Sequence, residues 1–193
     1  MLGLKLATDP RWVNIVERDL EEILSDHAWA EQKAASNALS IVTNNCEHAD
    51  LVTAMIAIAK EEVEHFELVH AIILKRGLQF RREKKDPYVN ELFGFLIKGG
   101  SRTAAFVDRM LFSALIEARS CERFKVLADN ISDKELSEFY SSLMASEAGH
   151  YSTFLGYARK YGQPVDVEKR WKEWLDFENS IIVKYGKAET VHG

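Results

Sequence analysis

Four glutamates and two histidines occur along this chain in a pattern that is written twice. In each copy, one glutamate is followed about 30 residues later by a Glu-x-x-His pair, whose two residues share one face of a helix. Mixed carboxylate and imidazole ligands suit iron or manganese, whereas structural zinc sites favour sulfur. The pattern therefore predicts a site for two metal ions with six ligands, which are Glu31, Glu62, His65, Glu117, Glu147 and His150.

The charge and the number of these ligands both fit a pair of divalent ions. Four carboxylates carry four negative charges, which two divalent cations balance. We expect Glu31 and Glu117 to serve mainly one metal each, while Glu62 and Glu147 can bridge the two metals. Each histidine would bind one metal through a ring nitrogen. Six side chains leave coordination positions open, where dioxygen or a peroxide can bind.

Three further residues lie one helical turn from the predicted ligands. His27 precedes Glu31 by four residues, and Ser120 and Cys121 follow Glu117 by three and four residues. We interpret them as residues that support the site, since an imidazole can orient a ligand and a hydroxyl or thiol can contact bound oxygen. The alternatives are a packed core histidine and small residues that allow close helix packing.

The ligands must be positioned by long helices. Steps of three and four residues trace one largely apolar stripe in each segment, and the Glu or Glu-x-x-His interrupts that stripe near its middle. Ser132 and Glu135 have the spacing of a capping box, which predicts the start of one helix. We expect helices at 10–43, with a break near Arg18, at 48–76, 102–129, 132–161 and 165–185, and a short one at 88–97 within a crossover at 78–101.

This order of elements predicts an all-α fold. A short turn, a long crossover and a second short turn are typical of a ferritin-like four-helix bundle, here with an additional short helix and a C-terminal helix. We predict that residues 1–193 form one ferritin-like di-metal domain. In an antiparallel bundle the middles of neighbouring helices meet at one level, so the six ligands should converge. Carboxylates in such a core are costly unless a metal neutralises them.

Composition excludes several classes of protein. The chain has 193 residues, 47% of them hydrophobic, and a net charge of −5, so it is a globular protein and not a general nucleic-acid binder. Cys46 and Cys121 form no Cys-x-x-Cys, which argues against a disulfide framework, an iron–sulfur site or a zinc finger. No signal peptide and no membrane-spanning run is visible, so the expected compartment is the cytoplasm.

The crossover and its approach are basic, in contrast with the acidic chain. Phe80 and Tyr88 lie in or beside this stretch. Phosphate neutralisation together with stacking on an unpaired base would need these residue types, whereas the alternative is a solvated basic loop. A second basic segment lies at 169–172. The six candidate RNA-binding cations of the crossover are Lys75, Arg76, Arg81, Arg82, Lys84 and Lys85.

Three stretches of the chain resemble one family. Residues 26–36, 60–66 and 146–151, which include Glu31, the first Glu-x-x-His pair and the second, are similar to the bacterial tRNA isopentenyladenosine hydroxylases (MiaE-like). The resemblance covers nearly the whole chain. It implies a non-haem di-iron monooxygenase that hydroxylates the isopentenyl side chain of (2-methylthio-)N6-isopentenyladenosine next to the anticodon of tRNA. The six ligands would then hold two iron ions, dioxygen would be the co-substrate, and a separate reductase or ferredoxin would supply two electrons.

Other ferritin-like functions are the alternatives. A rubrerythrin-like peroxide scavenger or a manganese catalase would use a similar ligand set, although rubrerythrins usually carry a cysteine-rich iron domain that is absent here. Ferritins, which store iron, use only one Glu-x-x-His. Ribonucleotide reductase small subunits place a radical tyrosine one turn after the histidine of the second helix, where this chain has Val69. The doubled pattern therefore favours a di-metal enzyme.

Overall fold

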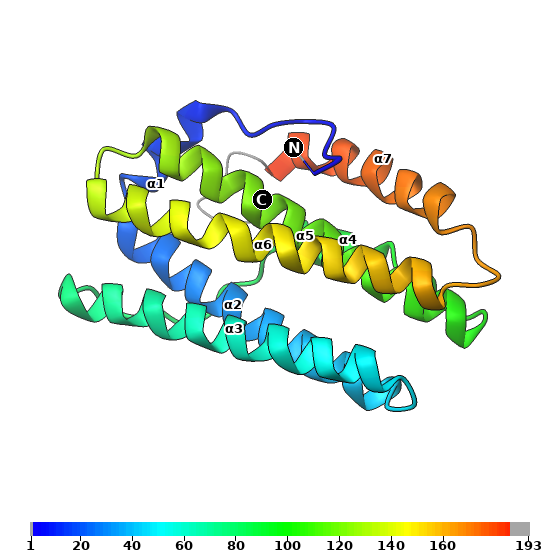
Figure 1. Ribbon diagram of the computed structural model, residues 1–193. Coiled ribbons are helices and arrows are strands. Elements are labelled where there is room, and N and C mark those ends of the chain that lie inside the picture. Colours follow the sequence, from blue (N-terminus) through cyan, green and yellow to red (C-terminus); the bar gives the residue numbers. More distant parts are fainter. Residues whose placement is uncertain (1, 186–193) are drawn as a thin grey trace. The chain divides into compact units, whose positions relative to one another are not determined.

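The computed structural model describes residues 2–185, and within that range the chain is helical without a strand (Figure 1). None of the helices in these residues combines the length and the apolar character needed to cross a membrane. In chain order the elements are the 3-10 helix η1 (Pro10–Trp12) and the α-helices α1 (Val13–Val16), α2 (Leu20–Asn44), α3 (Ala49–Lys75), α4 (Pro87–Gly94), α5 (Arg102–Asn130), α6 (Lys134–Tyr161) and α7 (Val167–Tyr185).

The described residues divide into two compact units. Residues 16–84 form one unit, which contains α2, α3 and the first part of the crossover and is called the α2–α3 unit below. Residues 2–15 and 85–185 form the other, called the α5–α6 unit, which also contains α4 and α7. Each unit is built around one helical hairpin that carries half of the predicted metal ligands.

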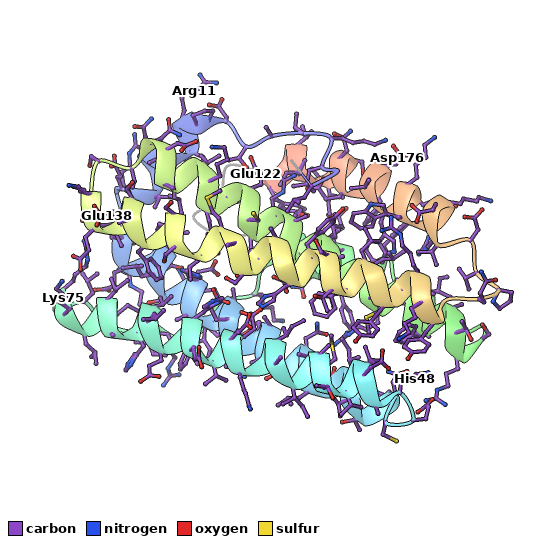
Figure 2. The ribbon with its side chains drawn as sticks, viewed as in Figure 1. Arg11, His48, Lys75, Glu122, Glu138 and Asp176 are labelled. Atoms are coloured by element: carbon purple, nitrogen blue, oxygen red, sulfur yellow. The ribbon has the colours of Figure 1, made fainter. Side chains whose placement is uncertain are left out.

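The α2–α3 hairpin begins and ends at local signals. The break expected near Arg18 is confirmed, because α1 ends at Val16 and α2 starts at Leu20 behind the cap Asp19, whose carboxylate accepts a hydrogen bond from the Glu22 backbone N–H at 3.0 Å. The next helix, α3, runs from its cap His48 to Lys75, both labelled in Figure 2. The chain then turns at Gly77, whose φ of +67° favours glycine.

Residues 78–84 form an extended strap along α2. The Gln79 backbone N–H donates to Glu21 at 3.0 Å, and the Trp29 indole N–H donates to the Arg81 carbonyl at 2.9 Å. Further along, Lys33 pairs with Glu83 at 2.8 Å. The strap therefore runs in the same direction as α2.

An aromatic cluster attaches the strap to both helices of the hairpin. The Phe80 ring stacks on Trp29 of α2, with ring centroids 4.8 Å apart. It also meets His70 and Phe66 of α3 edge-on, at centroid distances of 5.7 and 6.1 Å. Phe80 thus packs against the hairpin, which covers part of its apolar surface.

The α5–α6 hairpin starts its second helix one residue later than a capping box would require. The predicted cap Ser132 is wrong: the cap is Asp133, whose carboxylate accepts a hydrogen bond from the Leu136 backbone N–H at 3.1 Å. Asp and Ser cap helices about equally well, so the sequence alone did not decide whether Ser132 or Asp133 is the N-cap. With the cap at Asp133, Leu136 is buried in the core.

Two other boundaries differ from the predicted ones for visible reasons. Helix α4 ends at Gly94, three residues before the predicted end. The chain then turns towards α5, and the Ile97 backbone N–H donates to the carboxylate of Asp108 on α5 at 2.7 Å. Helix α7 begins at Val167 instead of 165, because the Asp166 carboxylate accepts from the Lys169 N–H at 3.0 Å in the manner of a helix cap.

Helix α7 packs along α5 in the same direction, and two ion pairs, one fully buried and one partly buried, fix this arrangement. Near the start of both helices, Arg170 donates to the Asp108 carboxylate through two nitrogens at 2.7 and 2.8 Å. About three turns later on α5, Arg119 donates to Glu178 of α7. In the first pair α5 supplies the acid and α7 the arginine, and in the second pair these roles are exchanged. If α7 ran in the opposite direction, like charges would therefore face each other.

The Arg119 pair belongs to a larger buried network. Arg119 is fully buried and also donates to Glu122 at 2.8 Å, and Glu122, labelled in Figure 2, accepts from the Thr8 backbone N–H at 2.8 Å. The Tyr88 hydroxyl donates to Glu178 at 3.1 Å, and burial together with the Glu178 charge raises the pKa of Tyr88 well above its ordinary value. The network joins α5, α4, α7 and the N-terminal segment.

Arg123 adds a second buried guanidinium one turn after Arg119. It lies over the Trp12 ring at 4.0 Å, and burial lowers its pKa to about 10, so it remains charged at neutral pH. Together with Glu122 and Glu178, the two arginines form a set of zero net charge.

Replacing Glu178 by Gln should destabilise the protein by about 3 kcal/mol, because removing one partner of a buried pair leaves the other charge uncompensated. The matched control is Glu173→Gln on the same helix, whose side chain is 44% exposed beside Arg170 and whose loss should cost less than about 1 kcal/mol. Chemical denaturation of both variants measures the difference. Equal effects would show that the buried network contributes no more than a surface pair.

Candidate metal centre

The α2–α3 unit brings three of the predicted ligands together. Glu62 and His65 lie three residues apart on one face of α3, and Glu31 lies on the stripe of α2 that packs against it. All three are buried, and one ligand atom of each lies within 4.8 Å of the others. The His65 Nδ1 is 3.3 Å from a Glu62 oxygen and 3.9 Å from a Glu31 oxygen. We call these residues the first triad.

The α5–α6 unit repeats this arrangement with the other three ligands. Glu117 lies in the middle of α5, and Glu147 and His150 share one face of α6. These residues, the second triad, are buried too, with one ligand atom of each within 4.8 Å of the others. The His150 Nδ1 is 3.7 Å from a Glu117 oxygen.

The donor set of each triad fits a metal ion. Two carboxylates and one imidazole supply oxygen and nitrogen ligands of the kind that iron and manganese accept. Two carboxylates held this close in a buried place repel each other, and a divalent cation between them removes that cost. Each hairpin thus carries a buried Glu, Glu and His cluster that is compatible with a metal centre.

The three supporting residues predicted from the sequence lie on the same helices. His27 is fully buried, and its Nε2 lies 2.6 Å from a Glu31 oxygen, which is hydrogen-bonding distance. Ser120 and Cys121 are buried on α5, and the Cys121 thiol donates to the Met144 carbonyl of α6 at 3.4 Å. Burial, with the nearby charges of Glu117 and Glu122, raises the pKa of the Cys121 thiol, so it stays protonated.

The cations of the crossover separate into two kinds. Arg81 donates to Asp19, Glu21 and Glu22 at 2.8, 2.6 and 2.9 Å, and these carboxylates raise its pKa. The ion pairs of Arg81 thus hold the strap against the start of α2. This role was not predicted from the sequence, although the acids Asp19, Glu21 and Glu22 at the start of α2 are the kind of partner that a basic loop can find.

The other candidate cations differ in their exposure and pairing. Lys84 pairs with Glu22 at 2.6 Å, but its side chain remains 67% exposed. Arg82 and Lys85 are exposed and make no ion pair within residues 2–185. Lys75 and Arg76 lie at the end of α3, with Lys75 exposed.

The cations of the second basic segment, 169–172, differ in exposure, since Lys169 and Lys172 are exposed and Arg170 is half-buried. Arg170 is committed to Asp108, and its guanidinium lies over the Phe95 ring at 4.5 Å. Trp171, in the same segment, is buried and packs in the core.

Comparison with known proteins gives concordant matches. A family model described as tRNA-(MS[2]IO[6]A)-hydroxylase (MiaE) matches residues 2–193. A Pseudomonas putida protein named tRNA 2-(methylsulfanyl)-N(6)-isopentenyladenosine(37) hydroxylase is 36% identical over 166 residues, which cover 86% of this chain and 80% of that protein. A Salmonella typhimurium protein of the same name is 31% identical over 142 residues, which cover 74% of this chain and 51% of that protein.

A solved structure is similar over almost the whole chain. It is a protein from Synechococcus described as having aldehyde deformylating oxygenase activity, with a TM-score of 0.90 and 30% identity, and the match covers 98% of this chain and 95% of that one. The all-α, ferritin-like fold class that the sequence predicts is confirmed.

Metal removal should lower the thermal stability of the protein, because the paired carboxylates of each triad then repel each other. A metal present at 100 times its dissociation constant adds about 2.7 kcal/mol to the unfolding free energy. Melting curves of chelator-treated protein with and without ferrous or manganous ion measure this. Glu67→Gln, an exposed acid of α3, is the control and should leave the metal effect unchanged. Coincident curves with and without metal would argue against both triads.

Proposed function

Because the chain belongs to the tRNA-(MS[2]IO[6]A)-hydroxylase (MiaE) family, we propose that it hydroxylates the isopentenyl side chain of (2-methylthio-)N6-isopentenyladenosine next to the anticodon of tRNA. The observation that carries the proposal is the family match over residues 2–193 in a chain with two buried Glu, Glu and His triads. The names of the two relatives support the same substrate class.

We propose that the triads hold two iron ions, one mainly on each, as parts of a single centre in one domain. The doubled ligand pattern and the balance of four carboxylates by two divalent ions support this arrangement. The chemistry that bound iron supplies is the reductive activation of dioxygen. One oxygen atom enters a C–H bond as a hydroxyl, and two electrons and two protons carry the other to water.

The protein's own side chains prepare the site for this chemistry. The six ligands lie in apolar stripes, where Ile58 and Val69 on α3 and Leu143 and Phe154 on α6 are buried on either side of the Glu-x-x-His pairs. These residues exclude water from the reacting atoms and favour an apolar isopentenyl group. His27 donates to Glu31 and holds that carboxylate in place.

We propose that the electrons come from another protein. Cys46 is exposed and Cys121 is buried on a different unit, and the sequence contains no Cys-x-x-Cys and no flavin motif. A separate reductase or ferredoxin is the expected donor. The proposed compartment is the cytoplasm, where the tRNA substrate is available.

We propose that phosphates of the tRNA contact Arg82 and Lys85 in preference to Arg81. The charge of Arg81 is balanced by three carboxylates, while Arg82 and Lys85 are exposed. A cation already paired with acids gains little from a phosphate, because the gain is offset by the loss of its existing partners.

Iron-loaded protein with a reductant and dioxygen should add one oxygen atom to isopentenylated adenosine in tRNA. Mass spectrometry of the digested nucleosides measures the product. The matched control is Glu117→Ala, which removes one ligand of the second triad and should abolish the gain. Peroxide consumption without any hydroxylated nucleoside would contradict the proposal and favour the scavenger function.

Charge reversal at Arg82 should weaken tRNA binding, and the loss should shrink as salt rises, because the interaction releases counterions from phosphate. The matched variant is Arg81→Glu, which places a fourth acid among Asp19, Glu21 and Glu22 and should lower the melting temperature. Filter binding at several salt concentrations, with melting curves for both variants, separates the effects. If Arg82→Glu binds tRNA as tightly as the unchanged protein, Arg82 and the strap do not contact the tRNA.

A further inference from the structure

One side of α3 carries large aliphatic side chains that face solvent. Ile56, Val63 and Leu74 are 41, 55 and 64% exposed. They are separated by 7 and 11 residues, which are about 1.9 and 3.1 turns of an α-helix, so the three side chains lie nearly in line. Lys60 and Glu67 lie on the same side, each four residues after an aliphatic member of the line. We call these five residues the α3 stripe.

The aliphatic members of the stripe make it a candidate contact surface. Single exposed aliphatic side chains are common on protein surfaces, but several in line along one helix are typical of a face that packs against another molecule. The stripe lies on the side of α3 turned away from the buried ligands Glu62 and His65. A partner bound there would therefore leave the first triad in place.

The two charged members of the stripe indicate what the partner carries. Lys60 and Glu67 are exposed and make no ion pair within residues 2–185. Each stands next to aliphatic side chains, where a charge without a partner would weaken an apolar contact. A molecule that covers the stripe must therefore present an acid to Lys60 and a cation to Glu67. A second copy of α3 presents both.

The two charges also fix the direction of a second copy. In an antiparallel pair with a two-fold axis between Val63 and Glu64, residues equally far from the axis face each other. Lys60 of each copy then lies opposite Glu67 of the other, so both charges are compensated. A parallel pair would bring Lys60 to Lys60 and Glu67 to Glu67, which like charges oppose. The antiparallel axis also brings two further pairs of exposed residues face to face, Ile56 with Ala71 and Thr53 with Leu74.

RNA fits this surface less well than a second copy does. Phosphate binding needs cations, and the stripe has one, Lys60, with the exposed acids Glu64 and Glu67 one turn and two turns further along the helix. The aliphatic members offer phosphate no favourable contact.

We propose that the α3 stripe is the interface of a symmetric dimer, in which α3 packs antiparallel against α3 of a second copy of this chain. The inference goes beyond the proposed function and does not depend on it, because none of the six proposed metal ligands belongs to the stripe.

Sedimentation velocity at increasing protein concentration tests the dimer. The unchanged protein should pass reversibly from monomer to dimer. Val63→Glu, which places an acid beside the two-fold axis, should keep the protein monomeric. The matched control is Leu68→Glu on the same helix, because Leu68 is 50% exposed but lies about four-tenths of a turn away from Val63. That variant should dimerise like the unchanged protein. A monomer at every concentration, or a dimer that Val63→Glu leaves intact, would overturn the inference.

A charge exchange tests the antiparallel arrangement. Lys60→Glu places two acids opposite each other, and Glu67→Lys places two cations, so each should raise the dissociation constant of the dimer about tenfold. The double variant Lys60→Glu with Glu67→Lys restores opposite charges and should recover the original constant. Melting curves check that every variant is folded. No recovery in the double variant would overturn the arrangement, whereas hydroxylation of tRNA by a protein that stays monomeric would overturn the dimer and leave the proposed function in place.

Discussion

The cost of placing ionisable groups in an apolar interior governs this structure. Each hairpin places two carboxylates and one imidazole in the middle of a stripe that is otherwise apolar, and all six residues are buried. An uncompensated buried carboxylate is far more expensive than a lost apolar contact, so such a stripe is stable only with a cation or a proton to neutralise it. The repeated Glu and Glu-x-x-His pattern places one such cluster in each of the two hairpins, so each hairpin needs its buried carboxylates neutralised.

The same cost explains how α5 is held on the face opposite Glu117. Four buried charged groups, Arg119, Arg123, Glu122 and Glu178, form a neutral set, and a second pair joins Asp108 to Arg170. Buried charges tolerate only the arrangement in which each finds its partner, so these pairs specify the direction and register of α7 more strictly than apolar packing would. Helix α5 therefore carries Glu117, a proposed metal ligand, on one face and the residues that pair with α7 on the other.

A shared scaffold does not by itself decide the reaction. The Synechococcus structure matches almost the whole chain and is described as having an aldehyde deformylating oxygenase activity, while the Pseudomonas putida and Salmonella typhimurium relatives are named tRNA hydroxylases. Ferritin-like helices supply ligands and a dry interior, and differences around them must select the substrate. In this chain the strap is held on α2 by Arg81, while Arg82 beside it is exposed.

Local patterns determined the helices and the membership of each triad. Helical periodicity places residues three or four apart on one face, so Glu62 with His65 and Glu147 with His150 could be paired from spacing alone. Helix ends were predicted within a few residues, and the cap at Asp133 was missed because an adjacent serine serves equally well.

Only the tertiary structure decided which partner each charge finds. The strap cation Arg81 meets acids at the start of α2, and Arg119 meets Glu178 on α7, both far away along the chain. Spacing along one helix carries no information about such partners, because an ion pair between distant segments depends on how the helices pack. The hydrogen bond of His27 to Glu31 lies between these cases: the spacing permitted it, and the burial and the 2.6 Å distance made it specific.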